Sequence, residues 1–97
     1  MKYAYTLRTT ILGECELRLT DFVGAREIYA SPEQAMAHAQ DFLLEVVSEK
    51  LEAMEFIPLP KQQAEVPLGI ELSHSLQLKI VNHNLMLERT GEIQDPI

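Results

Sequence analysis

The sequence has little of several features that would indicate a particular chemistry. It contains one cysteine, Cys15, and therefore no intramolecular disulfide, which fits a reducing compartment. It has no Cys-x-x-Cys pair, no glycine-rich phosphate loop and no serine-centred catalytic elbow. No apolar run approaches the length of a membrane span, and the start, MKYAYTLRTT, lacks the apolar core of a signal peptide. These absences favour a cytoplasmic protein that does not enter a membrane.

Positive charge is also scarce. The chain has 8 Lys and Arg residues against 15 Asp and Glu residues, which gives a net charge of −7. The deficit continues along the chain, because residues 1–60 hold 5 cations and 10 anions and residues 61–97 hold 3 and 5. Proteins that bind nucleic acid usually carry a basic surplus that neutralises phosphates. Nucleic-acid binding is therefore doubtful, and a basic protein is the favoured partner.

What the sequence does contain is typical of a small globular domain. Its 97 residues suit one domain with a short appendage, and 46% of them are hydrophobic and 24% charged. Two prolines, Pro58 and Pro60, end the longest helical pattern and favour an extended chain. We therefore predict a main domain over residues 1–60 and a C-terminal segment over residues 61–97.

Three strands are predicted before the first helix. Lys2 to Thr10 is rich in residues that favour strands, and Glu14 to Thr20 alternates apolar and charged residues with a period of two. Gly13 lies where the chain turns between them, so the two strands form an antiparallel hairpin. Arg26 to Ala30 is a third short strand. Cys15, on the apolar face of the second strand, is expected to be a buried structural thiol.

The strongest pattern in the chain is a long helix from Ser31 to Met54. Ser31 is a capping residue, Pro32 suits the first helical position, and Gln34 follows the cap by three residues. Apolar residues then recur every three or four positions and place one stripe on one side of the helix. We predict an α+β fold in which a three-stranded antiparallel sheet packs on this amphipathic helix.

A strand and a second helix are predicted in the C-terminal segment. The strand covers Val66 to Leu72, and the helix is capped by Ser73 or Ser75 and stopped by Gly91. These elements have more apolar surface than one small core covers, so we predict a homodimer. The residues predicted to form it are Val66, Leu68, Ile70, Leu72, Leu76, Ile80 and Leu87.

No group of residues predicts catalysis or a metal site. His74 and His83 lie nine residues apart on one predicted helix and point to different sides, and His38 lies on a polar flank, so surface or partly packed histidines are expected. Glu14 and Glu16 share one strand face, where they form a carboxylate pair or, more simply, a solvated surface. We predict a non-enzyme with no cofactor and no metal.

The order of these patterns resembles the HicB antitoxins of bacterial toxin–antitoxin pairs. The stretches that carry the resemblance are MKYAYTL, TDFVGA, SPEQAMAHAQDFLLEVVSEKLEA, EFIPLP and AEVPLGIELSHSLQLKIVNHNLML. The resemblance implies a partial ribonuclease-H-like fold without catalytic carboxylates. It also implies a partner, HicA, a small basic mRNA interferase whose active surface the antitoxin covers.

This resemblance yields the functional hypothesis of an antitoxin-like protein that neutralises a HicA-type toxin. The residues expected to contact the toxin are Glu14, Glu16, Asp21 and Phe22. HicB proteins usually continue into a DNA-binding module, whereas here residues 91–97 are too short for a second, groove-reading helix. A DNA-binding regulator that acts through a dimeric C-terminal segment is the alternative. A remnant nuclease that uses Glu14 is a third hypothesis.

Overall fold

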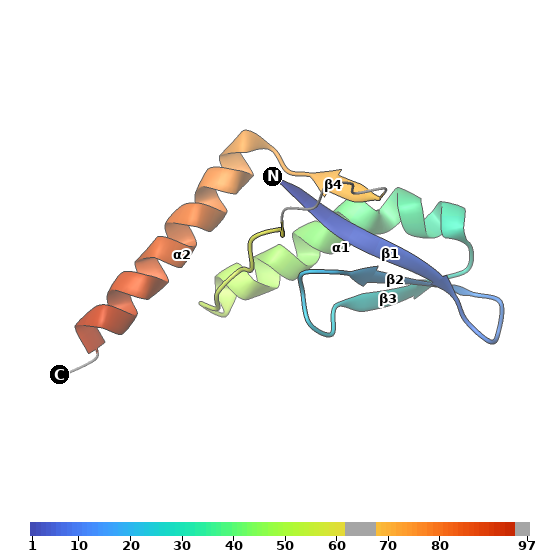
Figure 1. Ribbon diagram of the computed structural model, residues 1–97, viewed down its shortest axis with the longest axis horizontal. Helices are drawn as coiled ribbons and strands as arrows, with labels where there is room; N and C mark the ends of the chain where they lie inside the picture. The colour runs from blue at the N-terminus through green and yellow to red at the C-terminus, as the bar shows by residue number, and fades with distance from the viewer. Residues whose placement is uncertain (62–67, 95–97) are drawn as a thin grey trace.

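A four-stranded antiparallel sheet is covered on one face by a helix, and a second helix extends away from it (Figure 1). The computed structural model describes residues 1–61 and 68–94, with side chains described as far as residue 89. The elements in chain order are β1 (Lys2–Thr9), β2 (Cys15–Leu19), β3 (Arg26–Tyr29), α1 (Pro32–Glu52), β4 (Gly69–Glu71) and α2 (His74–Gln94). The strand order is β3-β2-β1-β4, and every neighbouring pair is antiparallel. The predicted α+β class is confirmed.

The hairpin of β1 and β2 follows the sequence pattern closely. Cys15, Leu17 and Leu19 alternate along β2 and are all buried on the side that faces α1. The turn between the strands needs Gly13, whose φ of +82° lies in the left-handed region that glycine adopts without strain. The expectation that Cys15 is a buried thiol is confirmed.

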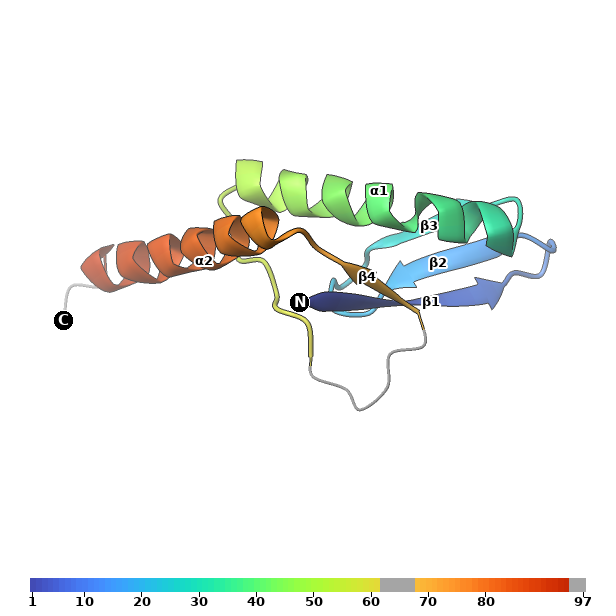
Figure 2. The same cartoon turned by 90° about the horizontal axis from the view of Figure 1, so that it is seen from above.

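Helix α1 lies across one face of the sheet, as Figure 2 shows from above. The hydroxyl of Ser31 accepts a hydrogen bond from the Gln34 N–H at 3.2 Å, and Pro32 occupies the first helical position. The fully buried side of the helix consists of Ala35, Ala39, Leu43 and Val47, one residue per turn. The helix ends at Glu52, two residues before the predicted end.

The predicted three-stranded sheet was one strand short. Strand β4 pairs with the free edge of β1, where Lys2 lies opposite Glu71 and Tyr3 opposite Ile70. Without β4, the edge of β1 beside the buried Tyr3 would leave its N–H and C=O groups unpaired. Residues on both sides of the predicted boundary at residue 60 therefore build one sheet.

Helix α2 begins at one of its two predicted caps but continues past its predicted stop. Of the two candidate caps, Ser73 is the one used, because its hydroxyl accepts a hydrogen bond from the Leu76 N–H at 3.3 Å. The predicted stop at Gly91 is wrong, since the helix continues to Gln94. A glycine inside a helix costs about 1 kcal/mol relative to alanine, which weakens a helix without ending it.

Candidate partner-binding site

A groove lies between α1 and the loop that joins β2 to β3. It has a volume of about 410 Å³, and its lining combines apolar side chains, two carboxylates and two cations: Phe22, Val23, Phe42, Val46, Glu49, Glu55, Arg26 and Lys50. We call it the α1 groove. The loop is held tightly, because the N–H of Ala25 donates to the Phe22 carbonyl at 3.2 Å and Gly24 has a φ of +78°. This turn leaves the Val23 side chain fully exposed at the groove edge.

The rim of the α1 groove continues into a row of carboxylates. Asp41, Glu45, Glu49 and Glu52 follow one another along α1 at spacings of four, four and three residues, and all are exposed. Residues at these spacings share one side of a helix, so the four form a single acidic stripe. Like charges four residues apart destabilise a helix by about 0.2–0.5 kcal/mol per pair. A cationic partner would remove this repulsion.

The negative potential of the stripe extends to β3. The pKa of Tyr29 is raised above its usual value, first by partial burial and then by the carboxylates of Glu27, Glu45 and Asp41. The Tyr29 ring also stacks on the ring of His38 from α1, with centroids 5.5 Å apart. Acidic side chains from a strand and a helix thus act on the same phenol, and α1 and β3 form one acidic side of the molecule.

Two of the predicted toxin contacts lie at this groove or beside it. Phe22 forms part of its floor, but the ring is 2% exposed and packs against Tyr3 with centroids 5.3 Å apart. It therefore shapes the groove but offers almost no surface of its own. The sequence did not indicate this role in the core, because Phe22 lies in a loop, where side chains are usually exposed. Asp21 is partly exposed, and its Oδ1 accepts a hydrogen bond from the Lys61 N–H at 3.4 Å.

The other two predicted contacts, Glu14 and Glu16, lie apart from the groove on the open face of the sheet. The Glu16 carboxylate is surrounded by arginines: Arg18 lies 3.2 Å away, Arg26 lies 3.9 Å away, and Arg8 is its cross-strand neighbour on β1. This part of the sheet therefore has more positive than negative charge. Its charge does not favour a basic partner, in contrast to the acidic stripe.

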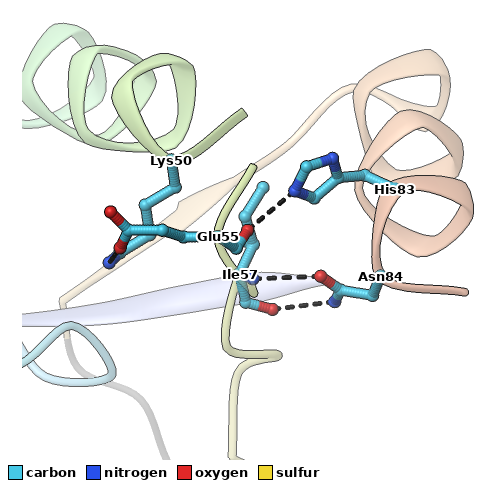
Figure 3. A network of polar contacts seen from close by, with 5 residues as sticks. All are labelled: Lys50, Glu55, Ile57, His83 and Asn84. Atoms are coloured by element: carbon cyan, nitrogen blue, oxygen red, sulfur yellow. Dashed lines mark hydrogen bonds and ion pairs between the residues drawn. The ribbon is translucent and has the colours of Figure 1, made fainter. Parts of the chain in front are cut away.

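Helix α2 is attached to the segment that follows α1 by three hydrogen bonds (Figure 3). The Asn84 amide accepts from the Ile57 N–H at 3.0 Å and donates to the Ile57 carbonyl at 2.8 Å. The buried His83 donates from Nε2 to the Glu55 carbonyl at 2.7 Å, since a carbonyl can only accept. Glu55 also forms an ion pair with Lys50 at 3.4 Å. No local sequence pattern indicates this attachment, because the hydrogen-bonded residues lie 27 or 28 positions apart in the chain.

The residues predicted for dimerisation divide into three groups. Ile70, Leu72 and Ile80 are buried in the core of their own chain, so they have no surface for a second copy. Leu68, Leu76 and Leu87 are partly buried, and Val66 lies outside the described residues. The apolar side chains that α2 does expose include Leu78, Val81 and Leu85. The sequence shows apolar residues on both sides of this helix but does not indicate which side meets the core.

Within residues 1–61 and 68–94, no three His, Cys, Asp or Glu side chains lie close enough together to hold a metal ion. Neither described helix is long and apolar enough to cross a membrane. The described side chains of α2 include two strong cations, Lys79 and Arg89, and one carboxylate, Glu88, which is a small charge surplus for a DNA-binding helix.

No protein-family model matches the chain, and no curated protein matches it. The resemblance to HicB antitoxins therefore rests on the ordered sequence patterns alone.

Proposed function

We propose that this protein is an antitoxin-like, non-enzymatic protein that binds and neutralises a small basic HicA-type mRNA interferase in the cytoplasm. The observation that carries the proposal is the α1 groove, where apolar walls lie beside the acidic stripe. The exposed Val23 and the partly buried Phe42 and Val46 offer apolar contact, and Glu49 supplies negative charge at the rim. The two cations that line the groove, Arg26 and Lys50, are paired with Glu16 and Glu55. A basic side chain with an aliphatic stem matches both features.

The site in this proposal differs from the one expected from the sequence. The sheet face around Glu16 is locally positive, whereas α1 and β3 present carboxylates from Glu27 and the acidic stripe. Charge complementarity accelerates encounter and selects among partners, so a basic toxin is expected to approach the α1 side. Because the stripe is exposed, its contribution falls as salt rises.

The test is a calorimetric titration of the purified protein with a basic HicA-type toxin, first with the wild type and then with two charge-reversal variants. Glu45→Lys combined with Glu49→Lys reverses the stripe, and we expect it to weaken binding at least tenfold, because complementary contacts become repulsive. Glu14→Lys combined with Glu71→Lys makes the same change of charge away from α1. Glu14 is partly exposed and Glu71 is exposed. This control is expected to bind within about threefold of the wild type, as surface charges far from an interface act weakly.

Two results would contradict the proposal. If the wild type binds no HicA-type toxin and does not restore growth to cells that express one, the antitoxin function is wrong. If both charge-reversal variants weaken binding equally, the function stands but the α1 groove is not the site. A parallel titration with DNA from upstream of the gene tests the alternative, a DNA-binding regulator, for which binding at low salt is expected.

A further inference from the structure

Helix α2 has an apolar face that stays exposed among the residues that the structure describes. Leu78, Val81 and Leu85 lie on this face, and Phe56 and Leu59 from the segment after α1 extend it. We call these five residues the α2 apolar face. Val81 is 37% exposed, and the other four side chains are about half exposed. Val81, Leu85, Phe56 and Leu59 also line a shallow groove of about 300 Å³.

The helix cannot turn this face toward the core, because its other side is already attached there. Ile80 is fully buried, and His83 and Asn84 are hydrogen-bonded to the backbone of Glu55 and Ile57. Rotating α2 to bury Val81 would expose Ile80 and break these hydrogen bonds. Figure 1 shows α2 extending away from the sheet and α1, so no other described element approaches this face. Contiguous exposed apolar surface of this kind is typical of an interaction site.

The charge distribution indicates which partner covers the α2 apolar face. The chain has a net charge of −7, so most pairs of surfaces on two copies repel each other. The charged side chains described near the α2 apolar face are Lys79, Glu88 and Arg89 of α2 and Glu55, which is paired with Lys50, so the face carries no negative surplus. The acidic stripe lies on α1, a different helix. The α2 apolar face is therefore a surface on which two copies can meet without bringing their carboxylates together.

The spacing of the apolar residues on α2 is also self-complementary. Leu78, Val81 and Leu85 recur at three and four residues, the spacing with which helices pack side by side. In an antiparallel pair with a two-fold axis near Val81, Leu78 of each copy lies opposite Leu85 of the other. This arrangement also places the two acidic bodies at opposite ends of the helix pair, where their repulsion is smallest.

We propose that two copies of this chain associate through the α2 apolar face as an antiparallel helix pair centred on Val81. Because the face consists of five side chains that are already about half buried, we expect a contact below the roughly 800 Å² per partner of a standard interface and association in the micromolar range. The proposed dimer leaves the α1 groove free and does not depend on the antitoxin function. It also differs from the predicted interface, in which the buried Ile70, Leu72 and Ile80 take part.

The first test measures mass by sedimentation equilibrium over low to high micromolar concentration. We expect the wild type to shift from 11.0 kDa toward twice that mass. Val81→Glu combined with Leu85→Glu should remain monomeric over the same range. Ile11→Glu combined with Leu12→Glu is the matched control, because both side chains are highly exposed in the β1–β2 turn. The control should associate like the wild type.

A second test locates the contact by cysteine cross-linking, and it works even if the charged variants fold poorly. Cys15 is buried, so an added exposed cysteine dominates the reaction. Under mild oxidation, Val81→Cys should form a disulfide-linked dimer and Ile11→Cys should not. A mixture of Leu78→Cys and Leu85→Cys chains should cross-link faster than either chain alone. A monomeric wild type, a dimer that survives Val81→Glu with Leu85→Glu, or equal cross-linking at Ile11 and Val81 would overturn the proposal.

Discussion

The sheet with α1 and the helix α2 are held in place in different ways. In the first region, α1 buries one residue per turn against the sheet, and Leu17, Leu43 and Val47 are almost fully buried. In the second region, Ile80 is the most deeply buried side chain described, and His83 and Asn84 supply directed hydrogen bonds. Apolar burial provides most folding free energy, whereas hydrogen bonds fix geometry at a smaller net gain. Stability therefore lies mainly in the first region, and α2 depends on a few contacts.

The largest difference between the regions is expected from shortening one leucine in each. Leu43→Ala in α1 should lower the free energy of unfolding by about 2–5 kcal/mol, because it leaves a cavity in the core. Leu85→Ala on α2 should change it by less than about 0.5 kcal/mol, since half of that side chain is already exposed. Urea unfolding followed by circular dichroism measures both values, at concentrations low enough to keep the chain monomeric. Equal losses would show that the two regions share one core.

The second prediction concerns the hydrogen bonds that attach α2. Asn84→Ala removes both the acceptor for the Ile57 N–H and the donor to the Ile57 carbonyl, within a partly buried contact. We expect a loss of about 1–3 kcal/mol, because these backbone groups lose their partners. Amide hydrogen exchange should accelerate at Ile57 and along α2, while the amides of β1 and β2 keep their protection. If β1 and β2 also exchange faster, α2 is part of the cooperative core.

The same contrast explains how much could be predicted from the sequence. Cys15, Leu17 and Leu19 alternate, and Ser31 with Pro32 starts a helix, so β2 and α1 follow from local patterns. The pairing of β4 with β1 joins residues about 70 positions apart, and no local pattern contains that information. The α1 groove could not be predicted from local patterns either, because Val23 and Glu49 line it from different parts of the chain.

Local sequence patterns also gave a different exposure for Phe22 and a different charge around Glu16 from those in the structure. Phe22 stands in a loop, where exposure is the default, but it packs on Tyr3. Glu16 was expected to face a basic partner because the chain as a whole is acidic, yet three of its nearest neighbours on the sheet are arginines. Net charge describes the whole chain and does not locate the charge on one face.

The third prediction tests a contact between the sheet and the segment that leads toward α2. The Tyr3 hydroxyl donates to the Pro58 carbonyl at 2.6 Å, and burial, with a smaller effect of Asp21, raises the pKa of Tyr3 from 10.0 to about 12. Tyr3→Phe should cost about 1 kcal/mol at neutral pH, the typical net value of a hydrogen bond.

The raised pKa also gives Tyr3 a signature in the pH dependence of stability. Between pH 10 and 12 the unfolded chain loses the phenol proton and the folded chain keeps it. Its contribution is therefore fully present below pH 10 and is lost as pH rises toward 12. Denaturant titrations across this range should show a decline in the wild type that is smaller in Tyr3→Phe. An unchanged decline would mean that Tyr3 ionises equally in both states.

The smallest effect is expected on the open face of the sheet, where Glu16 lies among arginines. Arg18 and Arg26 are direct cross-strand partners, and like charges in that position repel. Glu16 offsets this repulsion at 3.2 and 3.9 Å, but both arginines are more than half exposed, so Glu16→Gln should cost less than about 1 kcal/mol. A double-mutant cycle with Arg18→Gln, measured at low and high salt, isolates the pair. Coupling that disappears at high salt would confirm that Glu16 is neutralised by its neighbours. Zero coupling at low salt would leave its carboxylate available and make the open face a candidate for a basic partner again.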